Sequence, residues 1–151
     1  MNKKAVLLAD DDQDDVEIFK EALEIACPSN YFVHAPNGAE VFEYLNSTEN
    51  IKPDIIFLDL NMPEMNGWQC LAKLKNTRAY ENIPVIMYTT SSNPRDKQIA
   101  LDLNAHGLIT KPSNPKILER VLEAIICKID SNDLRSAISD AYLITKGLEN
   151  L

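Results

Sequence analysis

Strand-like and helix-like segments alternate five times along this chain, and this alternation constrains the fold more than any other feature. Short apolar runs typical of strands occur in five places: AVLLA (5–9), YFVHA (31–35), DIIFLDL (54–60), PVIMYT (84–89) and GLIT (107–110). Between them, apolar residues recur three to four positions apart, as Val16, Phe19 and Leu23 do, which is the period of an amphipathic helix. We therefore expect an α/β fold, a doubly wound parallel sheet with helices on both faces.

Burial patterns and capping signals refine this prediction. The first, third and fourth runs are continuously apolar, as strands covered on both faces must be, whereas the second alternates and is expected at an edge. Asn93-Pro94 and Asn114-Pro115 each place a capping side chain before a proline at the first helical position. Asn104 is expected to end a helix in the left-handed conformation.

Length and charge exclude several classes of protein. The 151 residues suit one domain, and the net charge of −8 argues against direct binding to nucleic acid or to an anionic membrane. The first apolar run is too short for a signal peptide, and no run could span a bilayer. The three cysteines, without a CxxC pair, indicate reduced thiols and a cytoplasmic protein.

The tail adds one element to the alternation. After a helix expected to end near Lys128, residues 130–151 contain apolar Leu134, Ile138 and Ala141 at helical spacing. We expect residues 1–130 to form the main domain and residues 131–151 an extra C-terminal helix that is not a separate domain. The helix could pack on the domain's own surface or widen a dimer interface.

Polar residues stand where four of the predicted strands end. In open parallel sheets, ligands bind outside the carboxyl ends of the strands, so these residues should converge on one pocket. They are Asp10, Asp11 and Asp12 after the first strand, Asp59 and Asn61 after the third, Thr89 and Thr90 at the fourth, and Lys111 after the fifth. Hard oxygen ligands in a partly open site suit Mg²⁺, and a lysine ammonium suits a phosphoryl oxygen.

Four motifs, in this order, resemble the receiver domain of two-component response regulators over roughly residues 3–128. They are LLADD, DIIFLDLNMPEMNGWQCL, PVIMYTTS and HGLITKPSNP. The resemblance implies a flavodoxin-like sheet of strand order 2-1-3-4-5 and a role in phosphorelay signal transduction. It implies that Asp59 is the phospho-acceptor, a nucleophile toward the phosphohistidine of a sensor histidine kinase or phosphotransfer protein.

The resemblance also implies roles for the residues around Asp59. Mg²⁺ would be held by the side chains of Asp10, Asp11 and Asp59 and by the backbone carbonyl of Asn61. Thr89 would be the switch hydroxyl, although its neighbour Thr90 leaves that assignment open by one position. Lys111 would pair with phosphorylated Asp59, and the Lys111–Pro112 bond would be cis. Leu108 departs from the family, which usually carries an aromatic residue there, so the usual ring rotation cannot be the signal.

We expect no DNA-binding or enzymatic output domain after the resembling region, because only a short tail follows it in this sequence. Output is therefore expected through altered protein–protein contacts with a downstream partner, on the face near residues 95–104 and 116–122. A homodimer stays open. We expect self-catalysed phosphorylation and dephosphorylation but not a turnover enzyme acting on an external substrate.

Three alternative interpretations compete for the acidic run. A haloacid-dehalogenase-type phosphatase would use Asp10 as nucleophile and Asp12 as acid, but this leaves Asp59 unexplained. A calcium EF-hand loop fails because Asp15 stands where that loop needs glycine. A phosphorylation-independent scaffold would not need the full set of acids, threonine and lysine. In the favoured interpretation, Asp12, Asp14 and Asp15 are acids at a helix N-terminus, and both histidines, His34 and His106, are structural.

Overall fold

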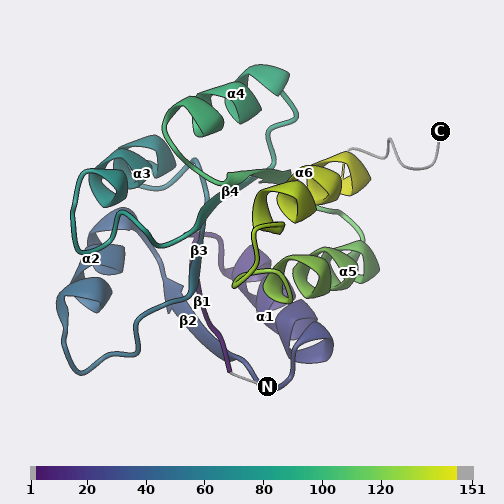
Figure 1. Cartoon of the computed structure of the whole chain (residues 1–151), viewed down its shortest axis with the longest axis horizontal. Helices are drawn as coiled ribbons and strands as arrows, with labels where there is room; N and C mark the ends of the chain where they lie inside the picture. Colours follow the sequence, from purple (N-terminus) through teal and green to yellow (C-terminus); the bar gives the residue numbers. More distant parts are fainter. Residues whose placement is uncertain (1–2, 146–151) are drawn as a thin grey trace.

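The computed structural model describes residues 3–145, which form a five-stranded parallel sheet with helices on both sides (Figure 1). The strands are β1 (Ala5–Ala9), β2 (Tyr31–Ala35), β3 (Ile55–Leu58), β4 (Val85–Thr89) and β5 (Gly107–Thr110). The helices are α1 (Gln13–Ala26), α2 (Gly38–Asn46), α3 (Gly67–Lys75), α4 (Pro94–Asp102), α5 (Pro115–Ile126) and α6 (Leu134–Thr145). The strand order is β2-β1-β3-β4-β5, which confirms the predicted fold class and topology.

Two apolar clusters, one on each face of the sheet, hold the layers together. In Figure 1, α1 and α5 lie on one side of the strands and α2 and α3 on the other. Every residue of β1, β3 and β4 is buried, whereas β2 begins with Tyr31, which is 43% exposed. The continuously apolar runs are therefore the covered strands, and the alternating run is an edge, as the sequence predicts.

The predicted helix boundaries are confirmed by the capping contacts. The Asn93 side chain accepts a hydrogen bond from the N–H of Arg95, and the Asn114 side chain accepts one from Lys116. Asn104 has a φ of 69°, the left-handed conformation expected at the end of α4. Because α1 to α5 each begin at a side chain that caps the helix, the connections that follow the strands are placed largely by the sequence itself.

Helix α6 covers the outer edge of the sheet. It lies over β5 and packs against α5, and Figure 1 shows it in the space between α4 and α5. A Cβ added at Gly107 would come within 2.5 Å of Ile138 Cγ2, so the close approach of α6 requires glycine in β5. The helix therefore packs on the domain's own surface and shields the edge of β5. Residues 146–151 of the predicted tail helix lie outside the described residues.

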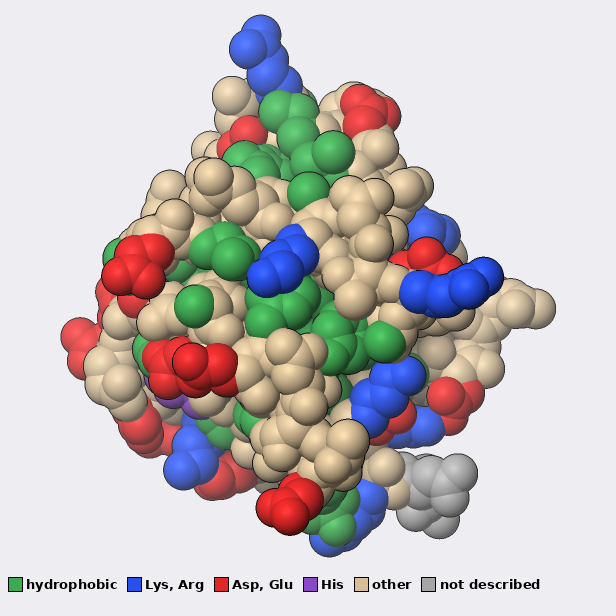
Figure 2. Space-filling view, turned by 90° about the vertical axis from the view of Figure 1, so that its left-hand side faces the viewer, with side chains coloured by type: hydrophobic (Ala, Val, Ile, Leu, Met, Phe, Trp, Pro, Cys, Tyr) green, Lys and Arg blue, Asp and Glu red, His purple; other side chains and the backbone are tan. Residues whose placement is uncertain are grey.

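The face that carries α2 and α3 is mixed in character. Figure 2 shows hydrophobic side chains in a broken band between scattered acidic and basic residues. The exposed Lys73 of α3 has its Nζ 4.3 Å from the ring centroid of Phe42 in α2. Within residues 3–145, no helix has the length and apolarity needed to cross a bilayer.

Candidate functional site

The end of β1 delivers a carboxylate that is completely buried. Asp10 is 0% exposed, and its N–H donates to the carbonyl of Ala35 in β2 over 3.1 Å. Its Oδ1 accepts a hydrogen bond from the N–H of Asp12 at 2.9 Å, and its carbonyl oxygen contacts His34 Nε2 at 2.8 Å. These contacts hold Asp10 in one position, and the ring of His34 has the structural role expected of it.

The end of β3 delivers a second carboxylate with slightly more access to solvent. The Asp59 side chain is 8% exposed, and its backbone N–H donates to the carbonyl of Ala9 over 2.9 Å. The following loop returns so closely that a Cβ on Gly67 would overlap the carbonyl oxygen of Asp59. Asn61 is exposed, and its N–H lies 3.5 Å from Asp59 Oδ1, which places its backbone beside the carboxylate.

Three carboxylates form one cluster at this edge of the sheet. Asp10, Asp11 and Asp59 each offer an oxygen atom within 4.8 Å of the others. Asp10 and Asp59 are buried while Asp11 is exposed, so the cluster is open on one side. Hard oxygen donors grouped in this way suit a divalent cation that keeps some of its water ligands, and the residues therefore fit a divalent-metal site.

Lys111, which follows β5, is the cation of the pocket. Its Nζ lies 2.8 Å from Asp10 Oδ2, 2.8 Å from Asp15 Oδ2 and 3.6 Å from Asp59 Oδ2. It also lies 5.5 Å from the ring centroid of Tyr88. Burial alone would lower the pKa of Lys111, but the hydrogen bonds to Asp10 and Asp15 outweigh it and raise that pKa. The ammonium group therefore stays charged between the two acids.

The electrostatic environment sets Asp59 apart from an ordinary carboxyl group. The pKa of Asp59 is raised from 3.8 to about 6. Burial is the largest cause, Lys111 opposes the rise, and Asp10 adds to it. Four acids (Asp10, Asp11, Asp15 and Asp59) face a single lysine, so the pocket carries an excess of negative charge. That excess is what a bound divalent cation would offset.

The end of β4 contributes a buried hydroxyl group. Thr89 is 0% exposed, while Thr90 is exposed. The Thr89 hydroxyl accepts a hydrogen bond from the N–H of Ser91 at 3.1 Å, and its carbonyl accepts one from the N–H of Lys111 at 2.7 Å. The threonine hydroxyl and the lysine are therefore linked through one short stretch of backbone at the ends of β4 and β5.

One expectation about this site is wrong, and two contacts of Lys111 were not predicted. No peptide bond within residues 3–145 is cis, so Lys111–Pro112 is trans; the two isomers of a bond before proline differ by only about 0.5–1 kcal/mol, and local context selects between them. Asp15 was assigned to the helix terminus alone, yet it pairs with Lys111. Tyr88 was treated only as part of a strand, yet its ring lies beside the same ammonium. Leu108 is 1% exposed and belongs to the core.

A helix begins inside the acidic run, which bears on the EF-hand interpretation. Asp12 caps α1 by accepting from the N–H groups of Asp14 and Asp15, so those acids belong to a helix that begins at Gln13. An EF-hand loop would need non-helical backbone through that region, which excludes it. A buried acid cluster with a lysine at the carboxyl ends of a doubly wound parallel sheet places a divalent-metal and phosphate type of site on a flavodoxin-like fold.

Comparison with known proteins agrees with this class. Residues 6–123 match the response regulator receiver domain, and the chain belongs to that family. The family serves two-component signalling, in which receiver domains are phosphorylated on aspartate and interact with histidine kinases and downstream targets. Its members are signalling proteins.

Individual relatives align with most of the chain. A chemotaxis protein CheY homolog of Campylobacter jejuni is 33% identical over 94 residues, which are 62% of this chain and 71% of that protein. Response regulator Rcp1 of Synechocystis is 29% identical over 126 residues, 81% of this chain and 86% of that protein. The phosphorylated cyanobacterial phytochrome response regulator RcpA has a similar structure, with a TM-score of 0.76, 30% identity and coverage of 86% of this chain and 96% of that chain. The Mn²⁺-bound form of Rcp1 has a TM-score of 0.71 at 28% identity, covering 81% of this chain and 91% of that chain.

Proposed function

We propose that Asp59 accepts a phosphoryl group from the phosphohistidine of a sensor histidine kinase or a phosphotransfer protein. A carboxylate oxygen of Asp59 attacks phosphorus, a P–O bond forms, and the P–N bond to the kinase histidine breaks. The observation that carries this proposal is the difference between the two buried acids. Asp10 is wholly buried and bonded to both Lys111 and the N–H of Asp12, whereas Asp59 keeps some exposure and lies 3.6 Å from Lys111. This difference also argues against a phosphatase that uses Asp10 as its nucleophile.

We propose Mg²⁺ as the divalent ion of the site, held by Asp10, Asp11, Asp59 and the backbone carbonyl of Asn61. The Mn²⁺-bound relative and the clustered carboxylates support a divalent ion, and the oxygen-only donor set favours Mg²⁺. When bound, the metal neutralises charge on the transferring phosphoryl group. Asp11, which is exposed, contributes its carboxylate from the open side of the cluster.

We propose that the side chains of Lys111 and Thr89 change their contacts when Asp59 is phosphorylated. Phosphorylation adds a dianionic group to Asp59, whose Oδ2 lies 3.6 Å from the Lys111 ammonium. Lys111, which bonds to Asp10 and Asp15 in the unmodified protein, should then exchange Asp15 for a phosphoryl oxygen. The buried hydroxyl of Thr89, and not the exposed Thr90, would then turn from Ser91 to a second phosphoryl oxygen. Lys111→Ala should permit phosphorylation of Asp59 but uncouple the response.

The output is proposed to be an altered protein–protein contact on the face formed by α4, β5 and α5. Because α6 lies over β5, this helix is part of that face, and a homodimer formed there would include it. We propose that residues 1–130 form the receiver and residues 131–151 its appendage. We further propose that the protein is cytoplasmic, contacts neither nucleic acid nor membrane directly, and turns over no external substrate. The net charge of −8 supports the exclusion of direct contact with nucleic acid.

The experiment that tests this function is intact-mass measurement after incubation with acetyl phosphate. Wild type and Asp59→Asn are compared with and without Mg²⁺. The proposal expects a gain of one phosphoryl group that depends on Mg²⁺ and is absent from the variant. Equal labelling of Asp59→Asn would contradict the assignment of the acceptor. Rapid phosphate release without an adduct would favour the phosphatase, and neither adduct nor release, with the cognate kinase also failing, would favour a scaffold.

A further inference from the structure

A polar cavity lies at the amino ends of the strands, whereas Asp59 lies at their carboxyl ends. It has a volume of about 400 Å³ and is lined by Lys75, Glu81, Asn82, Asn104, His106 and Arg135. These residues come from the end of α3, the connections that precede β4 and β5, and the first turn of α6. Because Asp59 and Lys111 follow the carboxyl ends of parallel strands, the cavity is separated from them by the length of the sheet.

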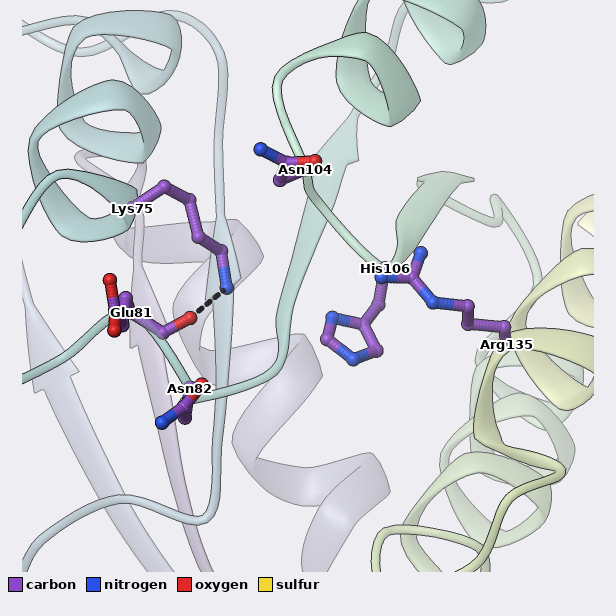
Figure 3. A pocket seen from close by; sticks show the side chains of 6 residues that line it. All are labelled: Lys75, Glu81, Asn82, Asn104, His106 and Arg135. Atoms are coloured by element: carbon purple, nitrogen blue, oxygen red, sulfur yellow. Dashed lines mark hydrogen bonds between the residues drawn. The ribbon is translucent and has the colours of Figure 1, made fainter.

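Three nitrogen-bearing side chains converge on this cavity. Figure 3 shows Lys75 and Arg135 reaching toward His106 from different sides, while the carboxylate of Glu81 turns away from the imidazole. Lys75 Nζ donates to the carbonyls of Glu81 and Ile83 at 3.1 and 2.9 Å, and Arg135 Nη1 donates to the carbonyl of Ala105 at 3.2 Å. Since an ammonium has three donors and a guanidinium five, both cations are anchored by backbone and keep further hydrogen-bonding capacity.

His106 has a buried ring nitrogen without a partner. Within residues 3–145, His106 Nδ1 is the buried side-chain polar atom for which the structure shows no hydrogen bond. Leaving a buried polar atom unpaired is unfavourable, so its presence beside two anchored cations calls for an explanation. A ligand with acceptor oxygens would satisfy Nδ1 as a donor and the two cations at once.

The electrostatics point in the same direction. The pKa of His106 is lowered to about 4, mostly by burial and in addition by the positive charges of Arg135 and Lys75. Burial also lowers the pKa of Lys75, with Arg135 adding to the effect and Glu81 opposing it. Positive charges therefore repel one another here, although the chain as a whole carries a net charge of −8. An anion in the cavity would relieve this repulsion.

We propose that this cavity binds a phosphate oxyanion, free or as a small phosphomonoester, through Arg135, Lys75 and His106 Nδ1. Planar guanidinium and ammonium groups together are the usual protein partners of phosphate oxygens. The side-chain amides of Asn82 and Asn104 stand at the rim and can donate further hydrogen bonds. The volume lies near the lower end of the range for small-molecule pockets, which leaves room for a small organic group on the phosphate. Because Arg135 belongs to α6, the bound ligand would tie this helix to the domain.

The test uses the two histidines as reporters in the full-length protein. Inorganic phosphate and glycerol 2-phosphate are titrated separately at pH 7.5, with chloride keeping the ionic strength constant and a chelator removing divalent ions. Without metal, the acid cluster around Asp59 repels phosphate, so binding there is not measured. The proposal expects a saturable shift of the His106 ring resonances, while the His34 resonances stay unchanged. Saturation by the monoester at lower concentration would identify the esterified form as the better ligand.

Matched variants test whether phosphate binds in this cavity. Arg135→Gln removes one charge-assisted hydrogen bond and should weaken binding about tenfold or more, whereas Arg135→Lys keeps the charge and should restore part of the affinity. Lys116→Gln makes the same charge change beyond the opposite edge, at a side chain that is 81% exposed, and should leave binding unchanged. Unchanged His34 resonances verify that each variant is folded. The proposal is overturned if neither ligand shifts His106 saturably, or if Arg135→Gln binds as tightly as wild type.

Discussion

The ammonium nitrogen of Lys111 lies 2.8 Å from Oδ2 of Asp15, a carboxylate from the first turn of α1. This contact joins an acid that follows β1 to a base that follows β5, across the carboxyl ends of β3 and β4. It competes with the interaction between Lys111 and Asp59, which is longer at 3.6 Å. In this structure Lys111 therefore lies closer to Asp15 than to the proposed phospho-acceptor.

Asp15→Asn is expected to destabilise the protein more than Asp14→Asn does. Both variants lose a helix N-terminal charge, but only Asp15 pairs with Lys111, whose side chain is 9% exposed. The difference should be about 1 kcal/mol in the free energy of unfolding, because the Asp15 side chain is itself one-third exposed and partly screened. Urea denaturation of the two variants measures it. Equal losses would mean that the ion pair contributes nothing beyond the helix-terminal effect.

Asp11→Asn should weaken divalent-metal binding. Asp11 supplies one of three carboxylate oxygens within 4.8 Å, and its exposure lets it be changed without disturbing the core. We expect a loss of at least about tenfold in Mg²⁺ affinity, since even the loss of an outer-shell partner of a metal ligand commonly costs that much. Calorimetric titration with Mg²⁺ measures this, with Asp14→Asn as the control of equal charge. The same loss in both variants would show that only net charge matters.

Metal-free protein should lose stability as the pH rises through the pKa of Asp59. Burial raises that pKa to about 6, above the ordinary value of 3.8, so the folded state holds the proton more tightly than the unfolded state. The resulting stabilisation is complete below about pH 4 and disappears as the pH passes about 6. Asp59→Asn, which cannot ionise, should therefore be more stable than wild type at pH 7 by roughly 1–3 kcal/mol and nearly equal to it at pH 4.

Unfolding of wild type and Asp59→Asn in chelator, at half-unit pH steps, tests this difference. Adding Mg²⁺ at pH 7 should reduce the advantage of the variant, because the ion stabilises the ionised wild-type cluster. A stability difference that does not vary with pH would contradict the raised pKa of Asp59.

Ile138→Ala tests whether α6 is an integral part of the core. Ile138 is 1% exposed and fits against Gly107 in β5. Truncation of such a side chain costs about 2–5 kcal/mol when the surrounding structure cannot collapse. Exposed Ser139→Ala, one position further along the same helix, should change stability little. A loss below about 0.5 kcal/mol for Ile138→Ala, within the usual range for surface substitutions, would mean that the helix is only loosely docked.

The topology could be predicted because its determinants are local. Each strand is a continuous or alternating apolar run, and the asparagines at 93, 104 and 114 mark helix ends whose caps depend on neighbouring backbone groups alone. The convergence of Asp10, Asp59, Thr89 and Lys111 follows from the topology itself, since parallel strands bring their carboxyl ends to one edge.

The parts that sequence reasoning missed depend on contacts between distant segments. An acid in the first turn of a helix is common, so nothing in the sequence around Asp15 indicates a partner 96 positions away. The isomer of Lys111–Pro112 was inherited from the family resemblance, and the small energy difference between isomers leaves the choice to the surrounding fold. The proximity of His106 to Lys75 and Arg135 could not be predicted, because these two side chains come from α3 and α6, which only the folded chain brings together.

The most direct test of the central claim is to locate the phosphoryl group. Protein treated with acetyl phosphate and Mg²⁺ is reduced with borohydride, which converts an aspartyl phosphate to a stable alcohol, and the modified residue is identified by peptide sequencing in a mass spectrometer. The proposed function predicts modification at Asp59 alone, with Asp59→Asn unmodified. Modification at Asp10 would contradict the receiver mechanism and indicate that the buried acid of β1 is the nucleophile.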